Sequence, residues 1–221
     1  IKYINRGEVL MTNLDFIYNR KSIRAYKDTE VPKEDILKML EAATLAPSPK
    51  HQQNWHFVVV QDKKVVAEIA EAVTKSHEHI ASFTKNEEEK KKFMNLLPYY
   101  INFKNAPCTI IVYANEYKMI EEKILRASNV GEDIIETMKS TDSAAQGIGA
   151  AVENFMLAAT AMGYGTCYMT GPVHAKREIE ELIGFEKPGY SLMSMISLGV
   201  PADDTPAQPK RKPLEEVVTF I

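Results

Sequence analysis

The sequence predicts a single layered domain of the α/β or α+β class. Amphipathic helical patterns alternate with short apolar runs that look like strands. Hydrophobic residues make up 45% of the 221 residues, which is enough for a substantial core. No internal repeat and no Gly/Ser-rich or Pro-rich linker divides the chain. Four strand-like runs between long helices are typical of helices packed against a central sheet.

The first half of the chain predicts a helix, a strand and a second helix. The first helix is expected between Pro32, which suits an N-terminal turn, and Pro47, which cannot continue a helix. An aromatic and β-branched run at 55–62 predicts a strand, and an amphipathic run at 63–74 predicts the second helix. The pattern then degrades over 75–104, where the stretch KNEEEKKK indicates a solvated helix face. We treat this segment as a candidate mobile cover over a site.

The second half adds three strands and two helices. The run at 106–115 does not alternate, which predicts a strand buried on both faces. The segment 142–165 is apolar around most of a helical circumference and rich in small residues, which suits a central helix at a subunit interface. A short strand at 166–169, an amphipathic helix at 174–184 and a last strand at 191–201 follow.

The two ends of the chain are treated as appendages of the domain at 14–221. We expect 1–13 to be an N-terminal extension, and Met11 is a candidate natural start. The C-terminal arm at 201–221 lacks core-forming residues until a strand-like run at 217–221. A terminal strand separated from its own core in this way often pairs with another subunit.

Charge and cysteine content narrow the class of protein. The formal net charge is −3, which argues against a general nucleic-acid binder. No apolar run approaches the length of a membrane span, and the N-terminus has no secretory signal pattern. Cys108 and Cys167 lie in apolar runs and are expected to be buried free thiols. We therefore expect a soluble cytoplasmic protein with no membrane partner.

Two cation-rich segments lie at opposite ends of the sequence. They contain Arg20, Lys21, Ser22 and Arg24 near the N-terminus, and Lys210, Arg211 and Lys212 near the C-terminus. Arginine guanidinium groups, which form paired hydrogen bonds, are together with a lysine and a hydroxyl the side-chain groups that typically bind a phosphate. Two unrelated solvated patches would explain the same charges, and charge alone favours that explanation because surface Lys/Arg runs are common.

Other chemical motifs are weak or absent. The segments QGIGAAVEN and GYGTCYMTG contain Gly-x-Gly, but neither completes the dinucleotide-binding fingerprint after a strand. The five histidines and two cysteines offer no zinc-site spacing, and no Gly-x-Ser-x-Gly elbow is present. The loop in APSPKHQQNWHFVVV places polar groups on a rigid turn, although a tight loop with one buried aromatic is the better explanation of this segment taken alone. Hydrolase and metalloenzyme interpretations are therefore disfavoured.

Taken together, four segments resemble the FMN-dependent nitroreductase family. They are RKSIRAY, APSPKHQQNWHFVVV, GAAVENFMLAATAMGYGTCYMTGP and KRKPLEEVV, in this order and at similar spacing, from about Leu14 to Val218. The resemblance implies an α+β fold with a mixed, mostly antiparallel central sheet flanked by helices. It also implies an intertwined homodimer, with FMN at the subunit interface and the C-terminal strand added to the partner's sheet.

The resemblance assigns roles to individual residues. The implied FMN contacts are Arg20, Lys21, Ser22, Arg24, Pro47, Ser48, Pro49, His51, Thr170, Gly171, Lys210 and Arg211. The cationic segments would hold the phosphate and ribityl end, with Arg24 near the pyrimidine edge of the flavin. The Pro47–Ser48 loop would come from the other subunit, and Thr170 and Gly171 would lie near flavin N5. The resemblance implies no metal, and no side chain is assigned as a catalytic acid or base.

The sequence departs from the common family pattern at two places: His51 stands where asparagine is frequent, and Asn54 stands where proline usually precedes the tryptophan. In addition, Thr170 replaces an acidic residue found in some relatives. These departures leave the role of His51 open and could alter the pocket for the acceptor.

The implied activity is a ping-pong transfer of electrons from NADH or NADPH through FMN to nitroaromatic, quinone or similar small-molecule acceptors. Reductive dehalogenation, a flavin-consuming synthase and a non-enzymatic flavin-binding module remain alternatives. A dehalogenase lid would need Glu, Tyr and Lys over the substrate. We see no convincing match for it in 75–104, and NEYK at 115–118 follows a strand instead.

Overall fold

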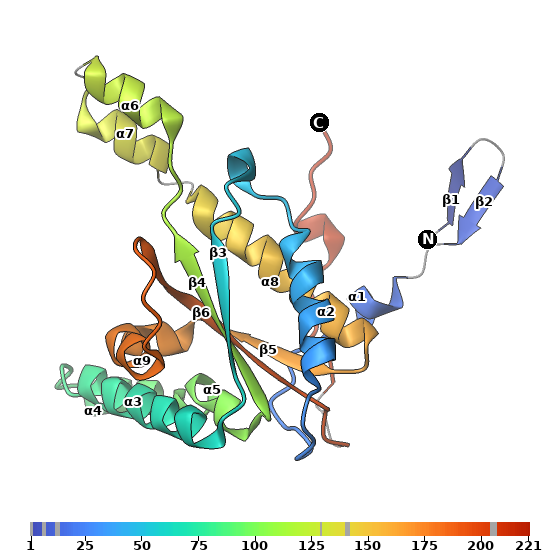
Figure 1. The fold of residues 1–221 in the computed structure, drawn as a ribbon, viewed down its shortest axis with the longest axis vertical. Coiled ribbons are helices and arrows are strands. Elements are labelled where there is room, and N and C mark those ends of the chain that lie inside the picture. The colour runs from blue at the N-terminus through green and yellow to red at the C-terminus, as the bar shows by residue number, and fades with distance from the viewer. Residues whose placement is uncertain (1, 6–7, 12–13, 129, 140–141, 204–206) are drawn as a thin grey trace.

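The computed structural model describes residues 2–5, 8–11, 14–128, 130–139, 142–203 and 207–221. A four-stranded sheet forms the centre of the molecule, with strand order β3-β4-β6-β5 and every neighbouring pair antiparallel (Figure 1). Its strands are β3 (Trp55–Val60), β4 (Cys108–Asn115), β5 (Gly165–Met169) and β6 (Tyr190–Gly199). The α+β architecture and the four strands are confirmed. The parallel component is a single bridge between Ser22 and Thr166 at the β5 edge.

Helices cover both faces of the sheet. One face packs against α2 (Lys33–Thr44) and α8 (Ser143–Ala161), and the other against α3 (Lys63–Ala81) and α9 (Lys176–Ile183). Strand β4 supplies both cores: Ile110 and Val112 join the first, while Ile111 and Tyr113 join the second, as alternation along a strand requires. All its residues except the last are buried, which explains its unbroken apolar sequence.

The central helix α8 is capped by a nearby side chain and is buried by packing against the rest of the fold. The Asp142 side chain caps it by accepting a hydrogen bond from the Ala145 amide at 3.0 Å. Ile148, Val152 and Phe155 are almost completely inaccessible to solvent. The helix ends at Ala161, and the chain then turns at Gly163, which adopts a positive φ.

The segment 75–104 is more regular than its sequence suggested. The helix predicted at 63–74 continues to Ala81, so its predicted end was wrong. Two short helices, α4 (Glu87–Met94) and α5 (Leu97–Tyr100), and a 3-10 turn at Asn102–Asn105 follow. Helix α4 carries the KNEEEKKK charges and has no buried residue, so the prediction of a solvated face is confirmed. Its role as a mobile cover remains a prediction.

Several elements were not predicted from the sequence. A helical hairpin, α6 (Ile120–Ala127) and α7 (Glu132–Lys139), projects from the body between β4 and α8; we call it the arm (Figure 1). The other unpredicted elements are β1 (Lys2–Asn5), β2 (Glu8–Met11), α1 (Asp15–Asn19) and 3-10 turns at Pro49–His51, Gly171–Ala175 and Leu214–Glu216. The first two strands form a hairpin within the predicted N-terminal extension.

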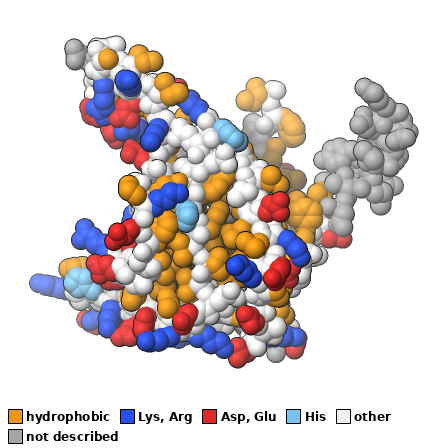
Figure 2. Space-filling model, viewed as in Figure 1, with side chains coloured by type: hydrophobic (Ala, Val, Ile, Leu, Met, Phe, Trp, Pro, Cys, Tyr) orange, Lys and Arg blue, Asp and Glu red, His pale blue; other side chains and the backbone are white. Residues whose placement is uncertain are grey.

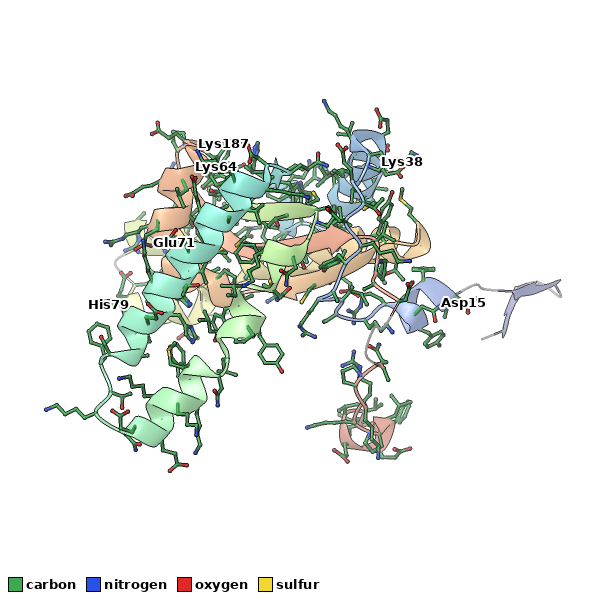
Figure 3. All side chains as sticks on the ribbon, turned by 90° about the horizontal axis from the view of Figure 1, so that it is seen from below. Asp15, Lys38, Lys64, Glu71, His79 and Lys187 are labelled. Atoms are coloured by element: carbon green, nitrogen blue, oxygen red, sulfur yellow. The ribbon has the colours of Figure 1, made fainter. Side chains whose placement is uncertain are left out.

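The C-terminal segment stands clear of the sheet and helices (Figure 3). Every residue from 207 to 221 is exposed, and within the described chain 217–221 joins no sheet. Pairing of this run with a partner's sheet therefore remains a prediction. No helix among the described residues is long and apolar enough to cross a membrane.

Candidate functional site

The N-terminal basic segment runs beside the edge of the sheet. Ser22 forms a parallel bridge with Thr166 of β5, and the Ile23 amide donates to the Thr166 carbonyl at 2.8 Å. Gly165 makes this approach possible, because a Cβ atom there would lie only 2.7 Å from the Ile23 side chain. The pairing places the cationic side chains of this segment next to the end of β5.

A cavity of about 290 Å³ opens where this segment meets the end of β5. It is lined by Arg24, Tyr99, Tyr100, Cys167, Tyr168, Met169, Thr170 and Gly171, and we call it the Arg24 pocket. The guanidinium of Arg24 lies 5.5 Å from the centroid of the Tyr99 ring, a cation–π contact. Gly171 packs against Tyr100, with no room for a Cβ atom. The fold thus brings Arg24 next to Thr170 and Gly171, which lie far from it in sequence.

Two aromatic side chains of the Arg24 pocket were missed in the sequence. Tyr99 and Tyr100 come from α5, inside the segment interpreted as a mobile cover. Helix α5 is only one turn long, and no periodic pattern marks so short an element. The proline and the two tyrosines of the stretch LLPYY were the available signal.

Both cysteine thiols are buried and protonated at neutral pH. Burial raises the pKa of Cys108 to about 12. Burial also raises the pKa of Cys167, while Arg24, Ser22 and other polar neighbours offset part of that effect. The free, buried thiols expected from the sequence are confirmed, and neither has the low pKa of a nucleophilic thiolate.

The two cation-rich segments approach each other because the C-terminal segment is bonded to the N-terminal one. The Gln208 side chain donates a hydrogen bond to the Arg20 carbonyl at 2.8 Å, so Lys210 and Arg211 follow shortly after this anchor. The Arg20 guanidinium lies 3.3 Å from a carboxylate oxygen of Glu153 on α8. Lys210 and Arg211 are exposed, as a clamp for an incoming anion requires.

The loop Pro47–His51 lies on a different part of the chain, against the first turn of α8. Pro49 would approach within 3.2 Å of a Cβ atom at Gly147, and Ser48 Oγ accepts from the Gln53 amide at 3.0 Å. His51 is exposed. Among the contacts of the described residues, none joins this loop to the Arg24 pocket. Within one chain the residues assigned to FMN therefore form two separate groups.

Asn54, the second departure from the family pattern, has a structural role. It is 4% exposed, its side chain donates to the Asn115 carbonyl at 2.7 Å, and its carbonyl accepts from the Asn115 amide at 2.8 Å. These bonds join the segment before β3 to the end of β4. A proline at this position would lack the side-chain donor.

A second cavity, of about 280 Å³, lies at the base of the arm. It is lined by Ala114, Asn115, Glu116, Tyr117, Met119, Met138, Lys139, Asp142, Ser143, Ala144, Gly189, Ser191 and Met193. Lys139 Nζ is paired with a carboxylate oxygen of Glu122 at 2.8 Å. On the face shown in Figure 2, hydrophobic side chains gather over the middle of the molecule below the arm. The sequence interpretation missed this cavity because its walls come from four separate segments.

The described residues contain no group of three or more His, Cys, Asp or Glu side chains that could hold a metal ion. His77 is buried and His79 lies on the exposed side of α3 (Figure 3), as expected for histidines two apart on a helix.

Comparison with known proteins places this geometry in a family. The family model described as "Nitroreductase family" matches residues 17–200. A protein of Archaeoglobus fulgidus, provisionally named an NADH dehydrogenase/NAD(P)H nitroreductase, is 31% identical over 86% of this chain and 86% of its own. An iodotyrosine deiodinase of Thermotoga neapolitana is 25% identical over 93% of this chain and 97% of its own.

Solved structures agree with these matches. The crystal structure of a BluB-like flavoprotein from Clostridium difficile 630 superposes with a TM-score of 0.90 at 35% identity, covering 96% of this chain and 99% of the other. Similar solved structures also include an FMN-dependent nitroreductase.

Proposed function

This chain belongs to the nitroreductase family and is an FMN-dependent oxidoreductase; we propose that it takes electrons from NAD(P)H and passes them to a nitroaromatic, a quinone or a similar small acceptor. Bound FMN would supply the redox chemistry in two alternating half-reactions that share one binding place. The observation that carries the proposal is the meeting of Arg24, Thr170 and Gly171 in one pocket at the end of β5.

The residues present suit a flavin in charge and in shape. Two-electron reduction places negative charge near N1 and the C2 carbonyl of a flavin, and a fixed cation there stabilises the reduced form. We assign this role to Arg24, whose guanidinium faces an open pocket and is held over Tyr99. Thr170 and Gly171 offer a backbone edge to a planar ring in this pocket, and the missing side chain of Gly171 lets Tyr100 pack against it.

We assign the phosphate and ribityl end of FMN to the cationic groups next to this pocket. Arg20, Lys21 and Ser22 lie on the segment paired with β5, and Lys210 and Arg211 follow the anchor at Gln208. Arginine forks, lysines and a hydroxyl match the oxygen atoms of a phosphate monoester. A bound phosphate would compete with Glu153 for Arg20, whose ion pair is already partly exposed to solvent.

We propose that the site is completed by a second copy of the chain. Pro47, Ser48, Pro49 and His51 make no described contact with the Arg24 pocket of their own chain, although the family resemblance assigns all of them to FMN. A homodimer with FMN at its interface reconciles these two facts. The exposed apolar tail also needs such a partner, since Phe220 is 95% and Leu214 70% exposed.

Reductive dehalogenation is the second candidate activity, because an iodotyrosine deiodinase is among the relatives that cover nearly the whole chain. A flavin-consuming synthase and a flavin-binding module without turnover use the same cofactor site. The candidates differ in whether bound flavin is reduced by NAD(P)H and which acceptor reoxidises it, so a reduction experiment separates them.

The test is an absorbance spectrum of the purified protein, followed by anaerobic titration with NADH and then with NADPH. We expect flavin bands that bleach with one equivalent of one donor and return when a quinone or nitroaromatic acceptor is added. Bound flavin that neither donor reduces would contradict the oxidoreductase proposal and favour the synthase or the binding module. A colourless protein that takes up no added FMN would overturn the cofactor assignment and its site residues.

A further inference from the structure

The loop that contains Pro47–His51 runs alongside the start of the arm. The antiparallel pairing of β3 with β4 ends with Trp55 opposite Ala114. Beyond the strands, Asn54 and Asn115 are joined by the two hydrogen bonds described above. The same antiparallel course continues outward from there, but the connections are made by side chains.

Gln52 makes the next connection. Its Nε2 donates to the Lys118 carbonyl at 2.8 Å, and its Oε1 accepts from the Lys118 amide at 3.0 Å. One side-chain amide thus satisfies both polar groups of a backbone residue, as a neighbouring strand would. Lys50 makes the outermost connection, with Nζ 2.6 Å from a carboxylate oxygen of Glu121 in the first turn of α6.

The backbone of the loop explains why side chains are needed. Lys50, His51 and Gln53 have φ values of 48°, 54° and 46°, in the left-handed region that non-glycine residues rarely occupy. A backbone in this conformation cannot continue a regular ladder. Such residues persist where their surroundings hold them in place, and they concentrate at ligand clamps and switch regions. The bonds from Gln52 and Lys50 to the arm are part of those surroundings.

The arm is held together by its own ion pairs. Arg126 on α6 forms paired hydrogen bonds with Glu132 on α7, both at 2.8 Å, and Lys139 bonds Glu122. A displacement of the start of α6 would therefore be transmitted to α7. The cavity at the base of the arm has walls on both sides of this hairpin, including Tyr117 and Met138, so it would change shape with the arm.

We propose that Gln52 is a positioning residue that makes the Pro47–His51 loop and the arm a single unit. The loop is assigned to the flavin and the arm borders a cavity, so Gln52 fixes the position of the arm relative to the flavin and, through it, how well an acceptor is held. This inference rests on the proposed function, because it takes the loop to be part of the flavin site.

The experiment compares Gln52→Ala with Gln61→Ala in the FMN-loaded enzyme. Gln61 is a matched control: its side chain also donates to a backbone carbonyl, that of Val31 at 2.9 Å, but it follows the opposite end of β3. For Gln52→Ala we expect the KM for a two-ring quinone to rise by up to about tenfold, because acceptor binding must then order a loop and an arm that two hydrogen bonds no longer join, with kcat little changed. Gln52→Glu keeps an oxygen that can accept from the Lys118 amide but loses the group that donates to the Lys118 carbonyl, so it should give a smaller rise in KM.

Hydrogen exchange supplies a second readout that needs no turnover. In the FMN-free chain, exchange of the Lys118 amide and of the first turn of α6 should become faster in Gln52→Ala and stay unchanged in Gln61→Ala. Unchanged KM values would overturn the positioning role, even if exchange were faster, because the bonds would then be only structural. If the unmodified chain itself binds no FMN or is not reduced, the proposed function fails first and the inference falls with it.

Discussion

Arg24 is distinguished from the other cations by its surroundings. Arg20 lies next to Glu153, and Lys27 pairs with Asp203. Among the described residues, no carboxylate lies within ion-pair distance of Arg24, whose guanidinium instead covers the Tyr99 ring. Its charge is thus available to a ligand in the Arg24 pocket, and the side chain is already oriented by its aromatic neighbour.

Replacing Arg24 by alanine should weaken FMN binding by about 10- to 100-fold, the cost of losing one charged hydrogen-bonding partner. The reduction potential of the bound flavin should fall, because the cation stabilises the reduced form. Fluorescence titration measures the affinity, and equilibration with a redox dye measures the potential. Lys27→Ala, on the same segment, is the control and should leave both unchanged. An unaltered FMN affinity in Arg24→Ala would contradict the assignment.

The buried His77 and the partly buried His174 lie behind the Arg24 pocket, with ring centroids 5.5 Å apart. His77 Nε2 lies 2.9 Å from the Phe93 carbonyl, which can only accept, so this nitrogen carries the proton. Ser76 Oγ donates to the His174 carbonyl and must therefore accept from His174 Nδ1. The remaining ring nitrogens, His77 Nδ1 and His174 Nε2, are buried, and the described protein groups leave them without a hydrogen-bond partner. Both rings contact Tyr100.

This arrangement predicts a loss of stability in acid. Burial, followed by the nearby His77, lowers the pKa of His174 below its ordinary value of 6.5, although Glu178 partly offsets this. In the unfolded chain the pKa of His174 returns to about 6.5, and in the folded chain it is lower. Between these two values the unfolded chain binds more protons than the folded one. The contribution to stability is therefore fully present above pH 6.5 and declines as the pH falls below it. Urea unfolding at about pH 5.5 and about pH 7.5 should show this decline in the unmodified protein, and a smaller one in His174→Gln. His79→Gln, at an exposed position, should keep the full decline; equal declines in all three proteins would rule out His174 as the cause.

At the scale of elements, the site depends on how the basic segment is attached to β5. Three features hold it: the bridge at Ser22, the hydrogen bond from the Ile23 amide and the absence of a side chain at Gly165. Ile23 is also buried, so the attachment includes an apolar contact as well as hydrogen bonds. The cationic residues on either side of Ile23 are therefore positioned by an apolar anchor rather than by their own charges.

Gly165→Ala should detach this segment. The new methyl group would lie 2.7 Å from the Ile23 side chain, and such overpacking costs about 1–3 kcal/mol of unfolding free energy. FMN affinity should fall as well, because the segment that carries the cations moves. Gly149→Ala is the matched control, since no atom lies within 4 Å of a Cβ atom there and alanine favours a helix by about 1 kcal/mol. A Gly165→Ala protein as stable as the unmodified one would show that the close approach is not required.

At the scale of the whole molecule, the single chain leaves apolar surface uncovered at its C-terminal end. Leu214, Val217 and Phe220 are exposed, and the segment stands away from the rest of the chain (Figure 3). Beyond the anchor at Gln208, its described hydrogen bonds are local, between neighbouring residues of the 3-10 turn. Such a segment contributes little to the fold of its own chain and is suited to cover another copy.

Deleting residues 214–221 should abolish the dimer and leave the fold of each chain intact. Sedimentation velocity should show a monomer, the melting temperature should lose its dependence on protein concentration, and FMN should bind more weakly. Phe220→Asp tests the same surface in the full-length chain. A truncated protein that remains dimeric would contradict the proposed exchange of C-terminal segments.

Much of the fold could be predicted because it depends on local patterns. The unbroken apolar run of β4, the small-residue helix α8 and the helix that begins after Pro32 each have a period or a terminus that can be recognised in the sequence. The arm was missed because its two helices are eight residues each, have a single described buried residue between them, Ile135, and project from the body. Length alone does not explain this, because α9 is also eight residues long and was predicted from its amphipathic pattern and the glycine at its C-terminal end.

The sequence by itself determined the layered domain, the two cationic segments and the order of motifs that resembles the nitroreductase family. It could do so because charge, hydrophobic period and motif order are properties of the chain. Only the tertiary structure decided that Arg24 meets Thr170 and Gly171, that Tyr99 and Tyr100 line their pocket, and that Gln52 joins the loop to the arm. These relations join residues from 66 to 147 positions apart, and they exist because antiparallel strand pairing and the packing of helices on both faces bring those residues together.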